Sequence, residues 1–489
     1  SVSGGHYERG LFRQLQEAIA QLEESEKRHK LEVAQLCQII EAQAKQIAQL
    51  TKEIELLRAE NDRLRSMLNN NSNNSSQPPS SDQKGKRINT YNRREKSGRH
   101  KGAQPGHPGK TLSRATVEEL IAAGKLQRHV VQHGSGYGRP VIKYVLDIEI
   151  VPFVTEHRFY PDSAGKYEIP GCHNSDVIYG DVLRALVVHL YGVGVVSNER
   201  IQAFIESMTD GVIKPSAGSV YGMLRGFSQA LSGELEVIHN SLLNQDVLYT
   251  DSTNVSIDGH QAFIRNLSTA NAVLYTCMPR KNLDNLRQIP VLPVFAGTLV
   301  HDHEVAMYQF GTGHGECNVH LLRHLTKNTE DTGHVWSDAL RDLLCSANQA
   351  RKHADSAGVP MSKAEIQKYS EAYDSICAQG EKENVDCRPK WAKQKEEALL
   401  RRLRAYKSNY LLFLYNAAVA FDNNLSERDL RKCKNRQKMS GGFRALDGAQ
   451  MYCRILSFIE TCKRRQLQPL SAMMSVLRGQ QVLCLANIG

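Results

Sequence analysis

Three carboxylates in this sequence have the residue types and the spacing that metal-dependent chemistry on phosphate esters requires. Asp251 and Asp302 each end a short apolar run of strand-like composition, and Glu427 lies in a charged, helix-like segment. Because the ends of neighbouring strands meet at one edge of a sheet, we expect the two aspartates to lie side by side. A third carboxylate from a helix would complete a site for two Mg²⁺ (or Mn²⁺) ions about 3.5–4 Å apart. Such hard cations take oxygen ligands, which accounts for Asp and Glu rather than Cys or His.

The residues around Glu427 favour a position beside DNA. Arg431 and Lys434 follow it at i+4 and i+7 and share its helical face, while Asn424 and Arg428 flank it. An isolated Glu in a helix is normally a surface residue, but one that shares a face with two cations suits an acid that ligates metal next to phosphates. One ion would lower the pKa of an attacking water or 3′-OH, and the other would stabilise the leaving oxygen.

The segments that carry these acids indicate an α/β domain with an α-helical insertion, because 124 residues separate Asp302 from Glu427. The strand-like runs are 247–253, 262–267, 272–276 and 297–302. The helix-like segments are 282–288, 337–357, 362–383 and 391–415. Cys317 and His320 lie one helical turn apart in the insertion. A metal role for this pair would need two more ligands, so packing or orientation of the acids is the favoured interpretation.

Residues 12–68 carry a heptad pattern in which thirteen of the seventeen a and d positions are apolar. From Val33 onward, β-branched residues at a and Leu at d favour a parallel two-stranded coiled coil, and Asn61 at an a position fits that geometry. Glu26 and His29 interrupt the first third of the pattern. The alternative is a long helix that packs on its own protein.

A linker follows the coiled coil, rich in Asn, Ser and Pro, which ends the helix and is expected to be flexible. Between Lys84 and Leu112 there are nine Lys and Arg against one acid, a net +8 in a chain of net charge +10. Phosphate backbones are the natural counterpart of such a local charge, although a solvated basic loop is the alternative. The candidate DNA contacts are Arg93, Arg94, Lys96, Arg99 and Lys101.

Residues 113–175 indicate a small mixed region, with strand-like runs at 141–151 and 156–160. Residues 176–243 become helical, and within them 198–208, a glycine-containing turn and 215–227 resemble a helix-turn-helix. Ser216 or Ser219 would cap the second helix. DNA contact and plain helical packing both remain open for this motif.

Composition excludes several classes of protein. No stretch approaches the roughly 18 uninterrupted apolar residues of a membrane helix, and no apolar run with a cleavage site opens the chain. The eleven cysteines include no C-x-x-C pair, so no disulfide framework or thiolate zinc site is indicated. We therefore expect a soluble, cytoplasmic, multidomain protein.

Several short motifs follow one another along nearly the whole chain. They are the coiled coil, the linker end at 78–82, the element at 102–107, the helical region, Asp251-x-Thr253, Asp302, and Asp-Asn-Asn-x-x-Glu-Arg at 422–428. In this order they resemble the bacterial insertion-sequence transposases of the insertion-sequence 66 family. Cys317 and His320 match a Cys and a His that the family shows between its second and third acids.

The resemblance implies a DDE transposase with an RNase H-like α/β catalytic domain, in which Asp251, Asp302 and Glu427 hold two Mg²⁺ (or Mn²⁺) ions and support strand cleavage and transfer. It implies as partners transposon-end and target DNA, a second copy of the chain, and small accessory proteins of the same element, with nucleoid association in the bacterial cytoplasm. The expected order is a dimerisation coiled coil (12–68), a flexible then basic linker (69–112), the small mixed region (113–175), a helical DNA-binding region (176–243), the first part of the core (244–303), the insertion (304–420), and the second part with C-terminal helices (421–489).

The chain departs from the family pattern at three places. Where family members have a zinc-binding Cys-x-x-Cys, it offers only Cys172 and His173, so no zinc is expected. Ser252 follows the first acid where the family generally has Glu. Asp302 lacks its usual Gly neighbour, which leaves Glu304 as the alternative second acid.

Two other functions remain possible on these residues. One is a dimeric DNA-binding protein with a catalytically inert RNase H-like domain, and the other is a general nuclease that ignores end sequences. The presence of all three acids favours the transposase. The terminal repeats, the target preference and the choice between cut-and-paste and copy mechanisms are not encoded in a readable form.

Neutralising the five candidate cations of the basic segment should weaken DNA binding regardless of sequence, because phosphates carry no sequence information. The slope of log K against log salt should flatten by up to roughly 4–5 units, at about 0.9 per lost phosphate contact. Binding isotherms at several salt concentrations, on element ends and on random DNA, measure this. An unchanged slope, or a loss confined to element ends, would contradict it.

Overall fold

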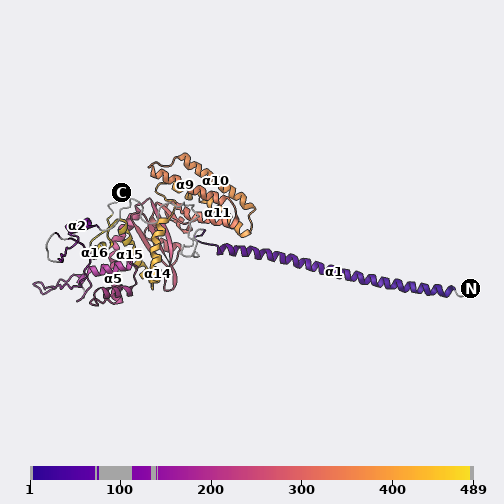
Figure 1. Ribbon diagram of the computed structural model, residues 1–489, viewed down its shortest axis with the longest axis horizontal. Coiled ribbons are helices and arrows are strands. Elements are labelled where there is room, and N and C mark those ends of the chain that lie inside the picture. The colour runs from indigo at the N-terminus through magenta and orange to yellow at the C-terminus, as the bar shows by residue number, and fades with distance from the viewer. Residues whose placement is uncertain are drawn as a thin grey trace. The chain divides into compact units, whose positions relative to one another are not determined.

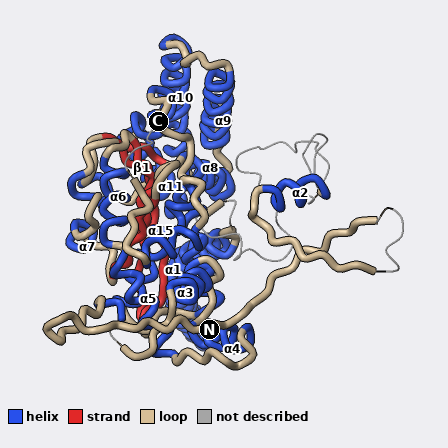
Figure 2. Tube along the Cα trace, turned by 90° about the vertical axis from the view of Figure 1, so that its left-hand side faces the viewer, coloured by secondary structure: helices blue, strands red, loops and turns tan. Residues whose placement is uncertain are grey.

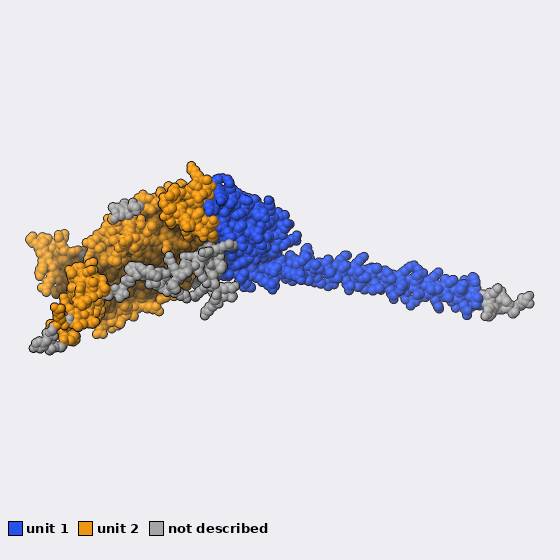
Figure 3. Space-filling view, turned by 45° about the horizontal axis from the view of Figure 1, so that its top comes forward, with its two compact units in different colours: residues 1–91, 322–344, 367–406 blue, residues 92–321, 345–366, 407–489 orange. Residues whose placement is uncertain are grey.

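The computed structural model describes residues 4–71, 74–75, 113–133, 139, 141–173 and 175–484. The chain forms two compact units, which Figure 3 shows in different colours. Unit 1 comprises residues 1–91, 322–344 and 367–406, and unit 2 comprises residues 92–321, 345–366 and 407–489. The candidate DNA contacts Arg93, Arg94, Lys96, Arg99 and Lys101 lie outside the described residues.

Unit 2 contains a five-stranded mixed sheet. Its strands are β1 (Val247–Ile257), β2 (His260–Ser268), β3 (Val273–Met278), β4 (Thr298–His301) and β5 (Gly313–Glu316). The order across the sheet is β3-β2-β1-β4-β5, in which β1, β2 and β3 are antiparallel neighbours and β4 and β5 run parallel to β1. Asp258 and Gly259, both with positive φ, form the tight turn between β1 and β2. The chain crosses from β3 to β4 through α7 (Leu283–Arg287) and the 3₁₀ turn Leu292–Val294, so that β4 runs parallel to β1.

The four strands and the short helix expected from the sequence are confirmed, with two differences. β1 continues to Ile257, so the prediction that Asp251 ends its strand is wrong: Asp251 lies inside β1, where its neighbour β4 stops. The sequence analysis did not predict β5, whose residues Gly-His-Gly-Glu lack the β-branched and aromatic side chains typical of strands. Its pairing with β4 supplies the stability that its composition does not.

Two helices cover the sheet, as Figure 1 shows for α14 (Asn424–Ser440) and α15 (Leu446–Arg464). α14 packs on β1 and β2, and α15 packs on β3. α15 is buried on nearly all sides between Met451 and Cys462, which is the pattern of a helix enclosed in a core rather than one on a surface. α14 has a strongly polar sequence and buries only one face, so its other face is free to carry charge.

The helical region packs against α15 and α16 (Pro469–Leu477). Its helices are α3 (Asp181–Gly192), α4 (Asn198–Met208), α5 (Ala217–Ala230) and α6 (Ser232–Leu243). The two helices of the expected helix-turn-helix are confirmed as α4 and α5. Ser216 caps α5, because its hydroxyl accepts the N–H of Ser219. DNA contact by α5 stays a prediction.

The two strand-like runs before the helical region, 141–151 and 156–160, form no strands, so this prediction is wrong. Beyond α2 (Arg114–Ala122) and the 3₁₀ turn Gly171–His173, the described part of 113–173 has no regular helix or strand and is drawn as loop in Figure 2. Val145 is 91% exposed. Alternating apolar residues favour a strand only where another strand completes the hydrogen bonding, and these runs have no such neighbour among the described residues.

The expected insertion, 304–420, is α-helical from Asn318 onward, but the prediction is wrong for its first part, which forms the 3₁₀ turn Val305–Gln309 and the sheet strand β5. The helix α1 (Gly4–Leu68) confirms one continuous N-terminal helix. The insertion contains α8 (Asn318–Thr332), α9 (Trp336–Ser356), α10 (Lys363–Val385), α11 (Lys390–Ala405), α12 (Lys407–Tyr410) and α13 (Leu412–Tyr415). The segment 391–415 was expected to be one helix. It is broken into three because α12 and α13 turn to pack on β5, and this tertiary packing overrides helix propensity. None of the described helices combines the length and apolar character needed to span a bilayer.

A buried carboxylate organises the insertion helices of unit 1. Glu396 on α11 accepts hydrogen bonds from Trp336 Nε1 (2.6 Å), Asn328 Nδ2 (2.8 Å), Asn384 Nδ2 (2.8 Å) and His334 Nδ1 (2.9 Å). Burial alone would raise the pKa of Glu396, but these donors together lower it below its ordinary value. Cys387 also lies close enough for a metal site with His334 and Glu396. The four donors already use the acceptor positions of the carboxylate, so the cluster is a hydrogen-bonded hub.

Replacing Glu396 by Ala should lower the free energy of unfolding by about 3 kcal/mol, because buried donors on three helices lose their acceptor. Both tryptophans, Trp336 and Trp391, lie in the insertion, so urea unfolding followed by tryptophan fluorescence reports on it directly. The folded-state pKa of Glu396 is lowered. Its contribution is therefore present above the unfolded-state pKa and lost as the pH falls through the folded-state pKa.

Glu397→Ala is the matched control, because Glu397 is 60% exposed and forms an exposed ion pair with Arg401 at 3.7 Å. It should change the stability by less than about 0.5 kcal/mol. Equal effects of the two variants would mean that Glu396 does not hold the insertion together.

Candidate active site

The structure brings Asp251, Asp302 and Glu427 together in unit 2. Asp251 lies on β1, Asp302 directly follows β4, and Glu427 occupies the first turn of α14. Burial, together with the nearby carboxylates of Asp302 and Glu427, raises the pKa of Asp251 to about 7. The N–H of Ser252 and the guanidinium of Arg265 oppose this rise. Three carboxylates that interact this strongly form one electrostatic site.

The strand register explains why the two aspartates meet. β1 and β4 are parallel, and their last paired residues are Tyr249 and Val300. Asp251 and Asp302 each lie two residues beyond that pair, so they reach the same level of the sheet. β4 ends at His301, whereas β1 continues beside β2. Among the described residues, no strand pairs with the edge of β1 beyond the end of β4, which leaves room there for the carboxylates.

Glu304, the alternative second acid, has a different partner. Its Oε2 lies 2.5 Å from Arg265 Nη2 in an ion pair, and the Arg265 side chain is only 1% exposed. Arg265 Nη1 also donates to Thr250 Oγ1 at 3.0 Å. Removing Glu304 from this pair would leave a buried guanidinium without its counter-ion, which is costly. The geometry therefore favours Asp302 as the second acid.

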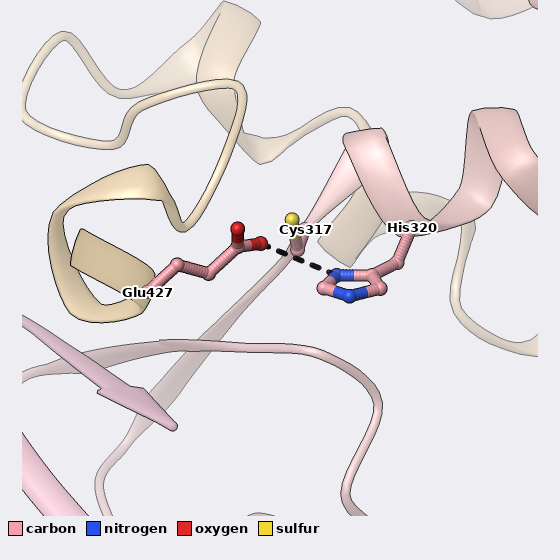
Figure 4. A group of neighbouring side chains, drawn as sticks. All are labelled: Cys317, His320 and Glu427. Carbon is pink, nitrogen blue, oxygen red and sulfur yellow. Dashed lines mark ion pairs between the residues drawn. The ribbon is translucent and has the colours of Figure 1, made fainter. Parts of the chain in front are cut away.

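Cys317 and His320 lie beside Glu427, as Figure 4 shows. Their possible ligand atoms and a carboxylate oxygen of Glu427 lie within 4.8 Å of one another, and His320 Nδ1 is 4.0 Å from Glu427 Oε1. Burial raises the pKa of the Cys317 thiol, and the nearby Glu427 carboxylate raises it too, so the thiol is protonated. The Cys317 sulfur instead accepts the backbone N–H of Asn423 at 3.4 Å. This arrangement supports an orienting role for Cys317.

Asn424, the expected supporting residue, is exposed at the start of α14. Its neighbour Asn423 is 1% exposed and donates from Nδ2 to the carbonyl oxygen of Thr250 at 2.8 Å. Sequence reasoning missed Asn423, because two adjacent asparagines cannot be assigned to a buried or an exposed face before the helix phase is known.

The exposed side of α14 is cationic. Arg428, Arg431 and Lys434 are all exposed, as their spacing predicts. They follow Glu427 along the same helix, so Glu427 and a row of exposed cations share one rigid element. A DNA backbone bound along this row would lie next to the carboxylates.

Comparison with known protein families agrees with this geometry. Residues 176–451 match the family described as Transposase IS66 family, a span of more than half the chain that includes all three carboxylates. Residues 30–113 match a family of unknown function (DUF6444). None of the curated proteins matches the chain.

Proposed function

Because this chain belongs to the IS66 family of transposases, we propose that it is a DDE enzyme that cleaves and joins DNA strands at the ends of an insertion sequence in a metal-dependent reaction. The observation that carries the proposal is the convergence of Asp251, Asp302 and Glu427 from two strands and a helix. The sheet order, with an antiparallel meander followed by two parallel strands, supports an RNase H-like core.

The three carboxylates fit a divalent metal centre. They offer only oxygen ligands, as Mg²⁺ and Mn²⁺ prefer, and their repulsion raises the pKa of Asp251. Glu427 Oε1 is buried and has no hydrogen-bond partner in the described part of the chain, so this oxygen is available for a cation. Two bound ions would supply activation of the attacking oxygen and stabilisation of the leaving oxygen. Asp251, Asp302 and Glu427 would hold them.

The chain's own residues would bind and orient the DNA. Arg428, Arg431 and Lys434 would contact phosphates beside the carboxylates, and the basic segment would add contacts that do not depend on sequence. We assign the choice of element ends to the helical region or the catalytic core, because phosphate contacts cannot provide it. The proposed partners are transposon-end and target DNA, together with small accessory proteins of the same element.

Replacing Asp251, Asp302 or Glu427 by Ala should reduce Mg²⁺-dependent strand cleavage to background while leaving DNA binding largely intact, since the carboxylates do not grip phosphates. Cleavage of DNA that carries the element ends, and binding of the same DNA, measure the two effects separately. Asp284→Ala is the control, because Asp284 is an exposed acid on α7.

Each of the other functions gives a different result in this assay. A wild type that binds DNA without cleaving it would be the inert DNA-binding dimer, and cleavage that ignores the element ends would indicate a general nuclease. If Asp302→Ala keeps its activity and Glu304→Ala loses it, the second acid is Glu304.

We also propose that α1 joins two copies of the chain in a parallel coiled coil. The described part of α1 exposes a long series of apolar side chains that a single helix cannot bury, and a second copy offers the same apolar series in register. Asn61 at its a position would pair with its own copy and disfavour other registers.

Two adjacent leucines test this dimer. Leu56 and Leu57 are 65% and 64% exposed on the helix, yet only Leu57 occupies a d position. Leu57→Asp should weaken dimerisation by at least about tenfold, because it places a charge in the coiled-coil core, whereas Leu56→Asp should not. Analytical ultracentrifugation over a range of protein concentrations distinguishes the two. Equal effects would exclude this heptad register.

A further inference from the structure

A buried asparagine on β2 joins the first and third acids. The Asn266 side chain is completely buried, and its Oδ1 accepts the backbone N–H of Asp251 at 3.1 Å and the hydroxyl of Ser426 at 2.6 Å. Its Nδ2 donates to the carbonyl oxygen of Ser426 at 3.1 Å and to Ser268 Oγ at 3.0 Å. All four hydrogen bonds of the amide are made. One side chain thus holds the backbone of Asp251 and the residue directly before Glu427.

A second path runs through Asn423. Its Nδ2 donates to the carbonyl oxygen of Thr250, the residue before Asp251, at 2.8 Å. Its own carbonyl oxygen accepts the backbone N–H of Glu427 at 3.1 Å. Asn423 therefore connects the backbone of Glu427 to that of Thr250 through two hydrogen bonds.

The helix side of this contact is a buried polar stripe. Asn423, Ser426 and Asp429 are spaced by three residues, so they share the face of α14 that packs on the sheet. Asp429 Oδ2 accepts from Ser268 Oγ at 2.7 Å and forms an ion pair with Arg464 Nη2 at 2.5 Å. Leu430 and Cys433 complete the buried face with apolar contacts.

A polar stripe of this kind fixes the register of the helix on the sheet. Apolar side chains tolerate small shifts, since their attraction depends little on direction. Buried hydrogen bonds do not, because a slip of α14 along β1 and β2 would leave the amide of Asn266 and the hydroxyl of Ser426 without partners in a dry interface. The position of Glu427 relative to Asp251 is thereby fixed.

We propose that Asn266, Asn423 and Ser426 are positioning residues that hold the Glu427 carboxylate at the distance from Asp251 that metal binding requires. This inference rests on the proposed metal-dependent function. None of the three side chains needs to touch DNA or metal, since each acts through the backbone of β1 or α14.

The test compares two buried serines that each link a helix to the sheet. Ser426→Ala removes one hydroxyl from this network, and Ser426→Thr keeps a hydroxyl at the same place. Ser457→Ala is the matched control, because Ser457 is also completely buried and its hydroxyl joins α15 to β3, accepting from the N–H of Tyr275 at 2.8 Å. Full-length proteins are compared by thermal unfolding, by Mn²⁺ binding without DNA, read as loss of the free-ion paramagnetic resonance signal, and by strand cleavage over a range of Mg²⁺ concentrations.

The two alanine variants should lose similar amounts of stability, but only Ser426→Ala should weaken Mn²⁺ binding and raise the Mg²⁺ concentration for half-maximal cleavage, by on the order of tenfold, since small misplacements of reacting groups are costly. Ser426→Thr should recover most of this loss. Asn266→Leu, which fills the same space without hydrogen bonds, should follow Ser426→Ala.

Equal metal binding by the Ser426→Ala and Ser457→Ala proteins would overturn the positioning role while leaving the proposed function intact. A wild type that binds Mn²⁺ through Asp251 but cleaves no DNA would overturn the function and leave the positioning role standing. A wild type that does neither would overturn both.

Discussion

Repulsion between like charges constrains the rest of unit 2. Asp251 is buried beside two other carboxylates, and both burial and their charges raise its pKa to about 7. Left to itself, such a group of acids would separate or take up protons. The fold must hold the three carboxylates together without neutralising their negative charge, because a neutral site would not attract a divalent cation.

The two faces of the sheet help to hold the three carboxylates together in different ways. On the face of Asp251, the contacts to α14 nearest the acids are made by the neutral side chains Asn266, Ser426 and Asn423, which fix positions without adding a counter-charge. Arg265 pairs in register with Ser252, next to Asp251, so its side chain lies on the opposite face. There its charge is directed to Glu304. The Arg265 charge opposes the rise in the pKa of Asp251 but does not cancel the negative charge at the site.

The convergence of Asp251, Asp302 and Glu427 could be expected from the sequence, because each is tied to a local pattern. The runs before Asp251 and Asp302 and the charged helix around Glu427 are visible over a few residues, and so are α4, α5 and most of the insertion. Features of the structure that depend on partners distant in the sequence could not be predicted in this way. β5 is a strand only because β4 lies beside it, and 141–160 is not a strand because none of the described segments pairs with it. Asn423 and Asn266 lie 157 residues apart in sequence, so neither could be recognised as part of the site before the sheet and α14 were placed.

α14 therefore combines a buried face that positions the third acid with an exposed face that is cationic. Its buried face holds Glu427 in register with Asp251, and its exposed face presents Arg428, Arg431 and Lys434. Any displacement of α14 would move Glu427 and these cations together. On the proposed function, DNA bound along this helix would therefore be aligned with the proposed metal site by the same hydrogen bonds that position the acids.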